Sequence, residues 1–173
     1  MHSCNRYEKL IKEKKEVADI FRYHSDRTEK IRDLAVSASK SMENLDRMLQ
    51  QHTASVCSEC RSVCCINRHS YHSFEDIVYI EALGEKLPVH ASGTEDSLPC
   101  QFLGKSGCGL PRAMRPYRCN WYFCTPLLEH IEERSSRYYR LFIRILQDIT
   151  FQRQRIILEF ESLSNLNVKE FRP

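Results

Sequence analysis

The sequence of 173 residues contains few helix-breaking residues and no long apolar run. None of its 5 glycines and 6 prolines lies between Met1 and Thr53. Its longest aliphatic run, Ile156 to Leu158, is much shorter than the roughly 18 to 20 apolar residues that a membrane-spanning helix needs. The first residues alternate charge with polarity and lack the apolar segment of a secretion signal. We therefore expect a cytoplasmic protein that neither crosses a bilayer nor is exported.

The chain also lacks a strong excess of one charge and the common catalytic motifs. Its 26 basic and 23 acidic residues give a net charge of +3, which is too balanced to predict a nucleic-acid partner. Phosphate-binding glycine loops, dinucleotide fingerprints, HExxH and serine nucleophile elbows are missing from the sequence. We therefore predict no catalytic residue and no organic-cofactor site.

Both ends of the chain have the apolar spacing of long helices. In residues 1–53, steps of three and four predict one narrow stripe of a helix about 43 residues and 65 Å long. Polar residues on such a stripe, here Lys14 and His24, usually set register or extend toward solvent. The positions of this stripe are Tyr7, Leu10, Lys14, Val17, Phe21, His24, Thr28, Ile31, Ala35, Ala38, Met42, Leu45 and Leu49.

Residues 126–173 carry a second stripe, which begins just after Pro126, a residue suited to a first helical turn. We expect a mainly α fold, in which two long antiparallel helices are capped by a small, loop-rich cysteine domain at residues 54–125. The alternative is a homodimer through the first helix. The second stripe consists of Leu128, Ile131, Tyr138, Phe142, Ile145, Ile149, Ile156, Phe160 and Leu163.

The central segment combines one short predicted helix with loops. Ser73 is a suitable cap for a helix that runs to Leu83 and ends at Gly84. Most glycines and prolines lie between Pro88 and Pro116, which indicates turns with little apolar material. Metal coordination would supply the order that hydrophobic burial does not.

Eight of the nine cysteines lie in this central segment, and Cys4 is isolated. A C-x2-C turn lets two thiolates converge on one metal, and cysteines in a reducing compartment hold metal more often than they form disulfides. The adjacent pair Cys64 and Cys65 points in different directions, so its members serve different centres or different metal atoms. The eight candidate ligands are Cys57, Cys60, Cys64 and Cys65, followed by Cys100, Cys108, Cys119 and Cys124.

These cysteines, with the neighbouring Pro99 to Leu103, Gly107 and Arg115-Pro116, resemble the YkgJ-type cysteine-cluster family. The resemblance covers residues of about 57 to 124 and implies a zinc- or iron-chelating domain whose metal ligands are those eight cysteines. The broader group includes flagellin lysine N-methylases, thought to carry an iron-sulfur cluster. The family commonly has glycine between the second and third cysteines, where this chain has Arg61, Ser62 and Val63.

Other polar and aromatic residues flank the cysteines. Arg112, Arg115 and Arg118 either lower thiol pKa values or make backbone hydrogen bonds in turns. His69 and His72 are close enough in sequence to replace a thiolate, although solvated loop histidines are commoner. The run from Trp121 to Phe123 is expected to form a hydrophobic wall of the site.

Three functions follow from these observations. Eight thiolates exceed the needs of one zinc site, which favours an iron-sulfur cluster such as 4Fe-4S, in electron transfer or redox sensing with a redox partner. The alternative is a structural Zn²⁺ module whose helices bind a protein partner. An oxidoreductase-like or methyltransferase-accessory role rests only on the resemblance.

Overall fold

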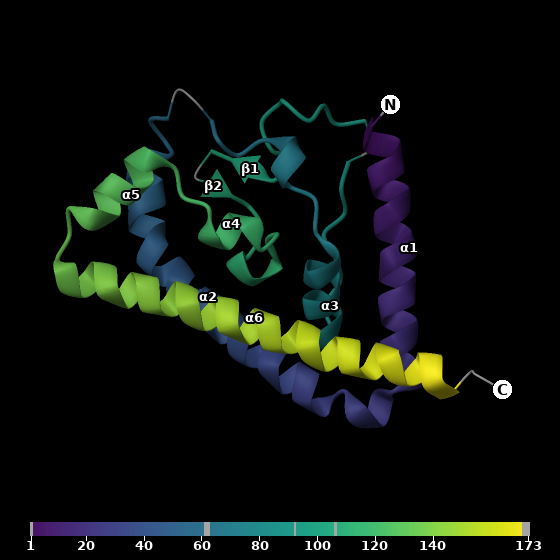
Figure 1. Ribbon diagram of the computed structural model, residues 1–173. Coiled ribbons are helices and arrows are strands. Elements are labelled where there is room, and N and C mark those ends of the chain that lie inside the picture. Colours follow the sequence, from purple (N-terminus) through teal and green to yellow (C-terminus); the bar gives the residue numbers. More distant parts are fainter. Residues whose placement is uncertain (1, 61–62, 92, 106, 171–173) are drawn as a thin grey trace.

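The computed structural model describes residues 2–60, 63–91, 93–105 and 107–170, and its side chains from residue 8 to residue 164. The fold is mainly helical, as the sequence predicts, with one two-stranded antiparallel ribbon (Figure 1). The elements are α1 (His2–Tyr23), α2 (Glu29–Val56), α3 (Phe74–Leu83), β1 (Leu103–Gly104), β2 (Gly107–Cys108), α4 (Arg118–Trp121), α5 (Thr125–Glu132) and α6 (Ser136–Glu170).

Helices α2 and α6 form the predicted antiparallel pair. Lys30 near the start of α2 forms an ion pair of 2.5 Å with Glu159 near the end of α6. At the opposite end, the Tyr138 hydroxyl donates to the Met48 carbonyl at 2.8 Å. The apolar stripes face each other and are buried at Ile31, Ala35, Ala38, Met42, Leu45 and Leu49 on α2, and at Phe142, Ile149, Ile156, Phe160 and Leu163 on α6.

The prediction of one continuous helix across residues 7–49 is wrong, because the chain turns between α1 and α2. A single turn of 3-10 helix at Ser25–Arg27 separates them. Serine and aspartate side chains compete for backbone hydrogen bonds and so disfavour helix interiors, which makes Ser25 and Asp26 a natural break. The Thr28 hydroxyl donates to the Ser25 carbonyl at 3.0 Å and stabilises the corner.

Beyond this corner, α1 leaves the long pair and packs against α3 (Figure 1). Val17 and Phe21 of the predicted stripe are buried, and Phe21 stacks on Phe160 with ring centroids 5.7 Å apart. His24 is also buried, whereas Lys14 is exposed. The side chain of Tyr7 lies outside the described residues. The stripe therefore identifies buried positions correctly on two helices of different direction.

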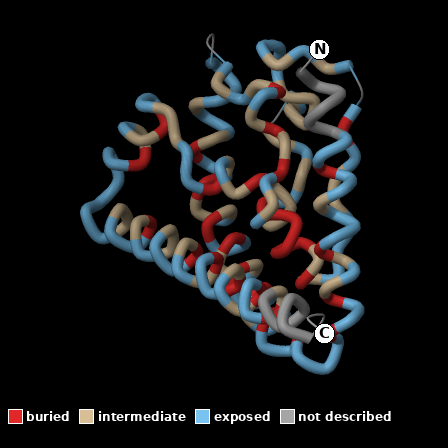
Figure 2. The backbone as a smooth tube through the Cα atoms, turned by 45° about the vertical axis from the view of Figure 1, so that its right-hand side comes forward, coloured by how far each residue is buried: buried red, intermediate tan, exposed pale blue. Residues whose placement is uncertain are grey.

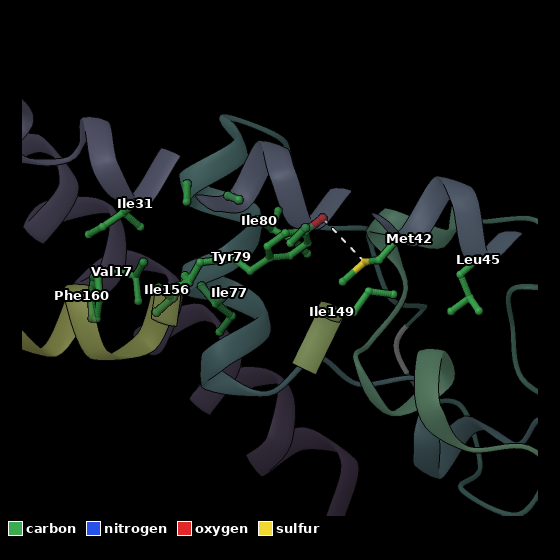
Figure 3. Close-up of a cluster of buried hydrophobic side chains, with 14 of the residues drawn as sticks. Val17, Ile31, Met42, Leu45, Ile77, Tyr79, Ile80, Ile149, Ile156 and Phe160 are labelled. Atoms are coloured by element: carbon green, nitrogen blue, oxygen red, sulfur yellow. Dashed lines mark hydrogen bonds between the residues drawn. The ribbon is translucent and has the colours of Figure 1, made fainter. Parts of the chain in front are cut away.

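The short helix α3 confirms the prediction for residues 73–84. Ser73 and Asp76 form a reciprocal capping box, and Gly84 ends the helix in the left-handed conformation with a φ of 72°. Helix α3 packs against α1, α2 and α6, and the Tyr79 hydroxyl lies 3.7 Å from the Met42 sulfur (Figure 3). Residues 54–125 therefore do more than cap one end of the helix pair, since they supply a core helix.

The carboxyl-terminal arm also divides into two helices. Pro126 lies in the first turn of α5, as predicted, but α5 ends at Glu132. The Ser135 hydroxyl accepts a hydrogen bond of 3.2 Å from the Tyr138 backbone N–H, which is the geometry of a helix cap, and starts α6. A serine cap therefore interrupts the predicted single helix.

We call α1, α2, α3 and α6 the helical framework, and residues 57–72 and 85–124 the cysteine segment. Buried positions are concentrated where the framework helices meet, and the outer faces are exposed (Figure 2). Among the described helices, none combines the length and apolar character required to cross a membrane.

Candidate metal centre

The first group of thiols forms where α2 ends and α5 begins. Cys57 follows α2 directly, and its N–H donates to Thr53 at 2.9 Å. The Cys60 N–H donates to the Cys57 carbonyl at 3.3 Å, so the C-x2-C sequence forms a turn. Cys124 is the residue before α5, and its carbonyl accepts the Leu127 N–H at 3.0 Å. Contacts between α2 and α5 bring these two helix ends together.

The mutual electrostatics of these thiols show which ones are neighbours. Burial raises the pKa of Cys57, and the thiols of Cys124, Cys64 and Cys60 raise it further. Burial likewise raises the pKa of Cys64, followed by the charge of Cys124 and a hydrogen bond with the Cys124 thiol. We call Cys57, Cys60, Cys64 and Cys124 the first thiol set.

The second group of thiols is built on backbone pairing. The Cys100 N–H donates to the Cys65 carbonyl at 2.9 Å, next to an isolated bridge between Ile66 and Pro99. Cys108 pairs with Leu103 in the β1–β2 ribbon, and the Leu103 N–H donates to the Cys100 carbonyl at 2.8 Å. Three cysteines from two distant stretches of sequence therefore converge.

Cys119 completes this group. Burial raises the pKa of Cys119 to about 11, and Cys108 and Cys100 are the next causes. Burial raises the pKa of Cys65 to about 12, with contributions from Cys64, Cys119 and Cys100. We call Cys65, Cys100, Cys108 and Cys119 the second thiol set.

Hydrogen-bond donors reach one sulfur of the second thiol set. Burial raises the pKa of Cys100, whereas the backbone N–H groups of Phe102 and Leu103 bond to its thiol and oppose that increase. Such N–H groups stabilise the negative charge of a thiolate.

The eight thiols are not core residues. As whole residues, Cys57, Cys60 and Cys65 are exposed and the other five are half-buried, and none of the eight forms a disulfide. Cysteines that act as small hydrophobic residues are usually among the most buried residues of a protein. Cys4 is outside the described side chains, as are Arg61 and Ser62 between the second and third cysteines.

The three arginines near the cysteines have different partners. Buried Arg112 donates to Asp46 at 2.8 Å, and Arg115 donates to the Leu110 carbonyl at 2.9 Å. Arg115 also lowers the pKa of Cys119, although burial and the neighbouring thiols outweigh it. Arg115 therefore both makes a backbone hydrogen bond and lowers the pKa of a thiol, the two roles that the sequence suggested. Arg118 instead donates to the Nδ1 atom of His69 at 2.7 Å.

The histidines proposed as alternative ligands have other partners. The Nε2 atom of His72 donates to the Met114 carbonyl at 3.0 Å, and its ring lies 5.7 Å from that of His90. Sequence reasoning missed His90, which is buried and donates to the Ser70 carbonyl at 2.9 Å. The Nδ1 atoms of His72 and His90 are buried without a partner among the described residues.

A second histidine pair, also missed, joins α2 to the last turn of α5. The Nδ1 atoms of His52 on α2 and His130 on α5 lie 2.9 Å apart. The Nε2 atom of His52 lies 3.0 Å from the Tyr138 hydroxyl. His52 follows Leu49 by three residues on the apolar stripe, and that spacing is the signal that could have identified it.

The hydrophobic wall of the metal site stays a prediction, and of its three residues only Phe123 packs against the core. Its ring packs 5.2 Å from that of Phe142 in the core. Trp121 ends the four-residue helix α4 and Tyr122 follows it, and both side chains are half exposed.

The chemistry of the thiol sets fits a soft metal, although their geometry is not that of a completed site. Among the described side chains, no three His, Cys, Asp or Glu residues are already arranged to hold a metal ion. The raised pKa values of Cys57, Cys65 and Cys119 mean that these three thiols hold protons at neutral pH and that close thiolates would repel one another. A bound cation would replace those protons and draw the sulfurs together.

No family model, curated protein or solved structure matches the chain.

Proposed function

We propose that the protein binds metal through its eight clustered cysteines and that the metal is held as an iron-sulfur cluster. The observation that carries this proposal is the gathering of eight thiols, none of them buried or in a disulfide, from residues 57–65 and 100–124. A cluster bound in this way would serve electron transfer or redox sensing in a reducing compartment such as the cytoplasm.

The composition of the ligands favours iron-sulfur chemistry. All eight candidates are sulfur donors, which select Fe–S clusters, zinc or copper(I) over harder metals. The hydrogen bonds from Phe102 and Leu103 to the Cys100 thiol are of the kind that tunes the potential of a cluster. The Nδ1 atom of His69 accepts a hydrogen bond from Arg118, which occupies that nitrogen as a possible metal donor.

The second candidate is structural zinc, which the same sulfur donors also favour. Four thiolates suit a tetrahedral Zn²⁺ ion, and eight would suit two. In that case the metal would order the cysteine segment and the exposed faces of the helices would bind a protein partner. Zinc is redox-inert, so the two candidates differ in colour and in response to reductant.

The test is the absorption spectrum of protein purified without oxygen, with iron, acid-labile sulfide and zinc assayed on the same sample. We expect a broad visible band that bleaches with dithionite, together with equal amounts of iron and sulfide. A colourless sample with stoichiometric zinc and no sulfide would favour the structural module instead. A sample that holds neither metal, even after anaerobic reconstitution with iron and sulfide or with Zn²⁺, would reject metal binding.

A further inference from the structure

We infer that the eight cysteines form two adjacent four-thiolate centres, divided as the first and second thiol sets, with the boundary between Cys64 and Cys65. This inference rests on the proposed function and goes beyond it by assigning ligands to centres. In chain order the cysteines fall into groups of 57–65 and 100–124. The thiol sets differ from those groups, because Cys65 joins Cys100, Cys108 and Cys119, whereas Cys124 joins Cys57, Cys60 and Cys64.

Backbone hydrogen bonds fix the second thiol set. The bond from Cys100 to the Cys65 carbonyl places these two residues side by side. Asn67 holds that arrangement, because its side-chain oxygen accepts the Gln101 N–H at 2.8 Å and its own N–H donates to Leu98 at 3.0 Å. The segment that carries Cys65 therefore belongs with the segment of Cys100 and not with the end of α2.

The far side of the second thiol set is held by arginines that meet at Asp46. Arg112 donates to the Cys119 carbonyl and Arg115 to the Cys108 carbonyl, each at 3.5 Å. Both arginines also approach Asp46 on α2, at 2.8 and 3.8 Å respectively. Cys108 and Cys119 are thus held against the same point of the framework.

Helix ends fix the first thiol set. Cys57 directly follows α2 and Cys124 directly precedes α5, and these two helices contact each other along their length, including at His52 and His130. Cys124 is the neighbouring group that most raises the pKa of Cys64 after burial, so the Cys64 thiol lies near the start of α5. Cys60 is brought back toward Cys57 by the turn between them.

The adjacent pair sits at the junction of the two sets. Residues 63–65 form no helix, and Ile66 enters the bridge with Pro99, so the chain leaves the first set and joins the second within one residue. The thiols of Cys64 and Cys65 each affect the pKa of the other, so these two side chains lie close together. The two centres would therefore lie next to each other, each with four sulfur ligands for a soft metal.

The test compares two double variants that share Cys57. Cys57→Ser with Cys124→Ser removes two ligands from the first set and leaves the second set complete. Cys57→Ser with Cys65→Ser removes one ligand from each set. In the chain-order grouping the roles reverse, because Cys57 and Cys65 then share a centre and Cys57 and Cys124 do not. Cys4→Ser is the matched control outside both sets.

Metal per chain, and its retention against a competing chelator, is measured for each protein after anaerobic reconstitution with iron and sulfide and, separately, with Zn²⁺. We expect the Cys57/Cys124 variant to keep half of the wild-type metal with wild-type retention. The Cys57/Cys65 variant should lose retention at both centres, and the Cys4 control should match the wild type.

The division would be overturned, and the chain-order grouping supported, if the Cys57/Cys65 variant kept half of the metal and the Cys57/Cys124 variant lost retention at both centres. A single centre would be indicated if the Cys57/Cys124 variant kept either all or none of the metal. A wild-type protein that takes up neither metal would reject the proposed function itself. Helical circular dichroism monitors folding, and a second pair, Cys100→Ser with Cys119→Ser, must also leave half of the metal because it spares the first set.

Discussion

The helical framework and the cysteine segment are organised by different interactions. Among the described side chains, all the largest fully buried ones lie on α2, α3, α5 and α6, and the cysteine segment contributes no buried hydrophobic residue. Its buried residues are instead polar or charged, as with Asn67, Arg112 and Asn120. The framework therefore gains its stability from apolar burial, which is the dominant favourable term in folding.

The cysteine segment has to be ordered by directional contacts. Asn67 alone connects residues 95, 98 and 101 to its own turn, through bonds of its side-chain amide and its backbone N–H. Such a network is stable when every polar group in it has a partner. It contributes less to the unfolding free energy than an apolar core of the same size. This difference implies that bound metal would contribute most to the stability of the cysteine segment, where the least apolar surface is buried.

The largest expected effect comes from the residue that joins the two regions. Arg153 on α6 is buried, pairs with Asp76 at 2.5 Å, and lies over the rings of Tyr79 and Tyr117. The Tyr117 N–H also donates to Asp76 at 3.0 Å. Arg153→Leu would leave a buried carboxylate without its cation, and we expect a loss of about 3–5 kcal/mol of unfolding free energy in denaturant titrations.

The matched control is Arg155→Leu on the same helix, where the side chain is exposed. Its unfolding free energy should stay within about 0.5 kcal/mol of the wild type. Equal losses of unfolding free energy in the two variants would show that the Arg153–Asp76 pair contributes no more to stability than an exposed arginine does.

A second experiment separates the two regions by removing metal. Chelator-stripped protein should keep the hydrogen-exchange protection of α2, α3 and α6, because their buried stripes contain no cysteine. Amides of residues 63–72 and 99–109 should exchange faster by at least about tenfold, since a metal that binds only the folded form contributes its binding energy to local order. Reloading with metal should restore the slow exchange.

Uniform loss of protection along α2 and α6 after stripping would contradict the comparison, because the framework would then depend on the metal. Unchanged protection in the cysteine segment would show that its hydrogen bonds suffice without metal.

Much of the framework was predictable because burial leaves a periodic record in the sequence. The spacing from Leu10 to Leu49 identified buried positions, and Ser73 and Gly84 marked the ends of α3. The corner at Ser25 was not predicted, because the same period continues across it and only the packing of α1 on α3 determines the new direction.

The candidate site was predictable in composition and not in arrangement. Cysteine spacing identified eight thiols, but their grouping depends on contacts between distant residues, such as the bond from Cys100 to Cys65. A hydrogen bond of this kind has no periodic signal in a sequence. For the same reason His52 and His130 were missed, since 78 residues separate two imidazoles that touch.

The smallest expected effect tests that histidine pair, which joins α2 of the helical framework to α5. Burial lowers the pKa of His52, and the charges of His130 and Arg134 lower it further from the ordinary value of 6.5. The folded protein therefore favours neutral His52, while the unfolded chain takes up a proton near pH 6.5. Its contribution to stability is complete above that pH and is lost as the pH falls below it. Unfolding free energies measured from about pH 8 to about pH 5 should thus fall more steeply for the wild type than for His52→Gln.

Tyr138→Phe provides the control, because it removes the hydroxyl 3.0 Å from His52 and leaves both imidazoles in place. This variant should lose about 1 kcal/mol at neutral pH through the missing hydrogen bonds and should keep the wild-type slope with pH. Equal slopes for His52→Gln and the wild type would exclude His52 as the source of acid sensitivity. A flattened slope in Tyr138→Phe would assign that sensitivity to the hydroxyl contact instead of to proton uptake by the imidazole. A flattened slope only in His52→Gln would place a pH-sensitive contact between α2 and α5, the two helices that carry Cys57 and Cys124 at their ends.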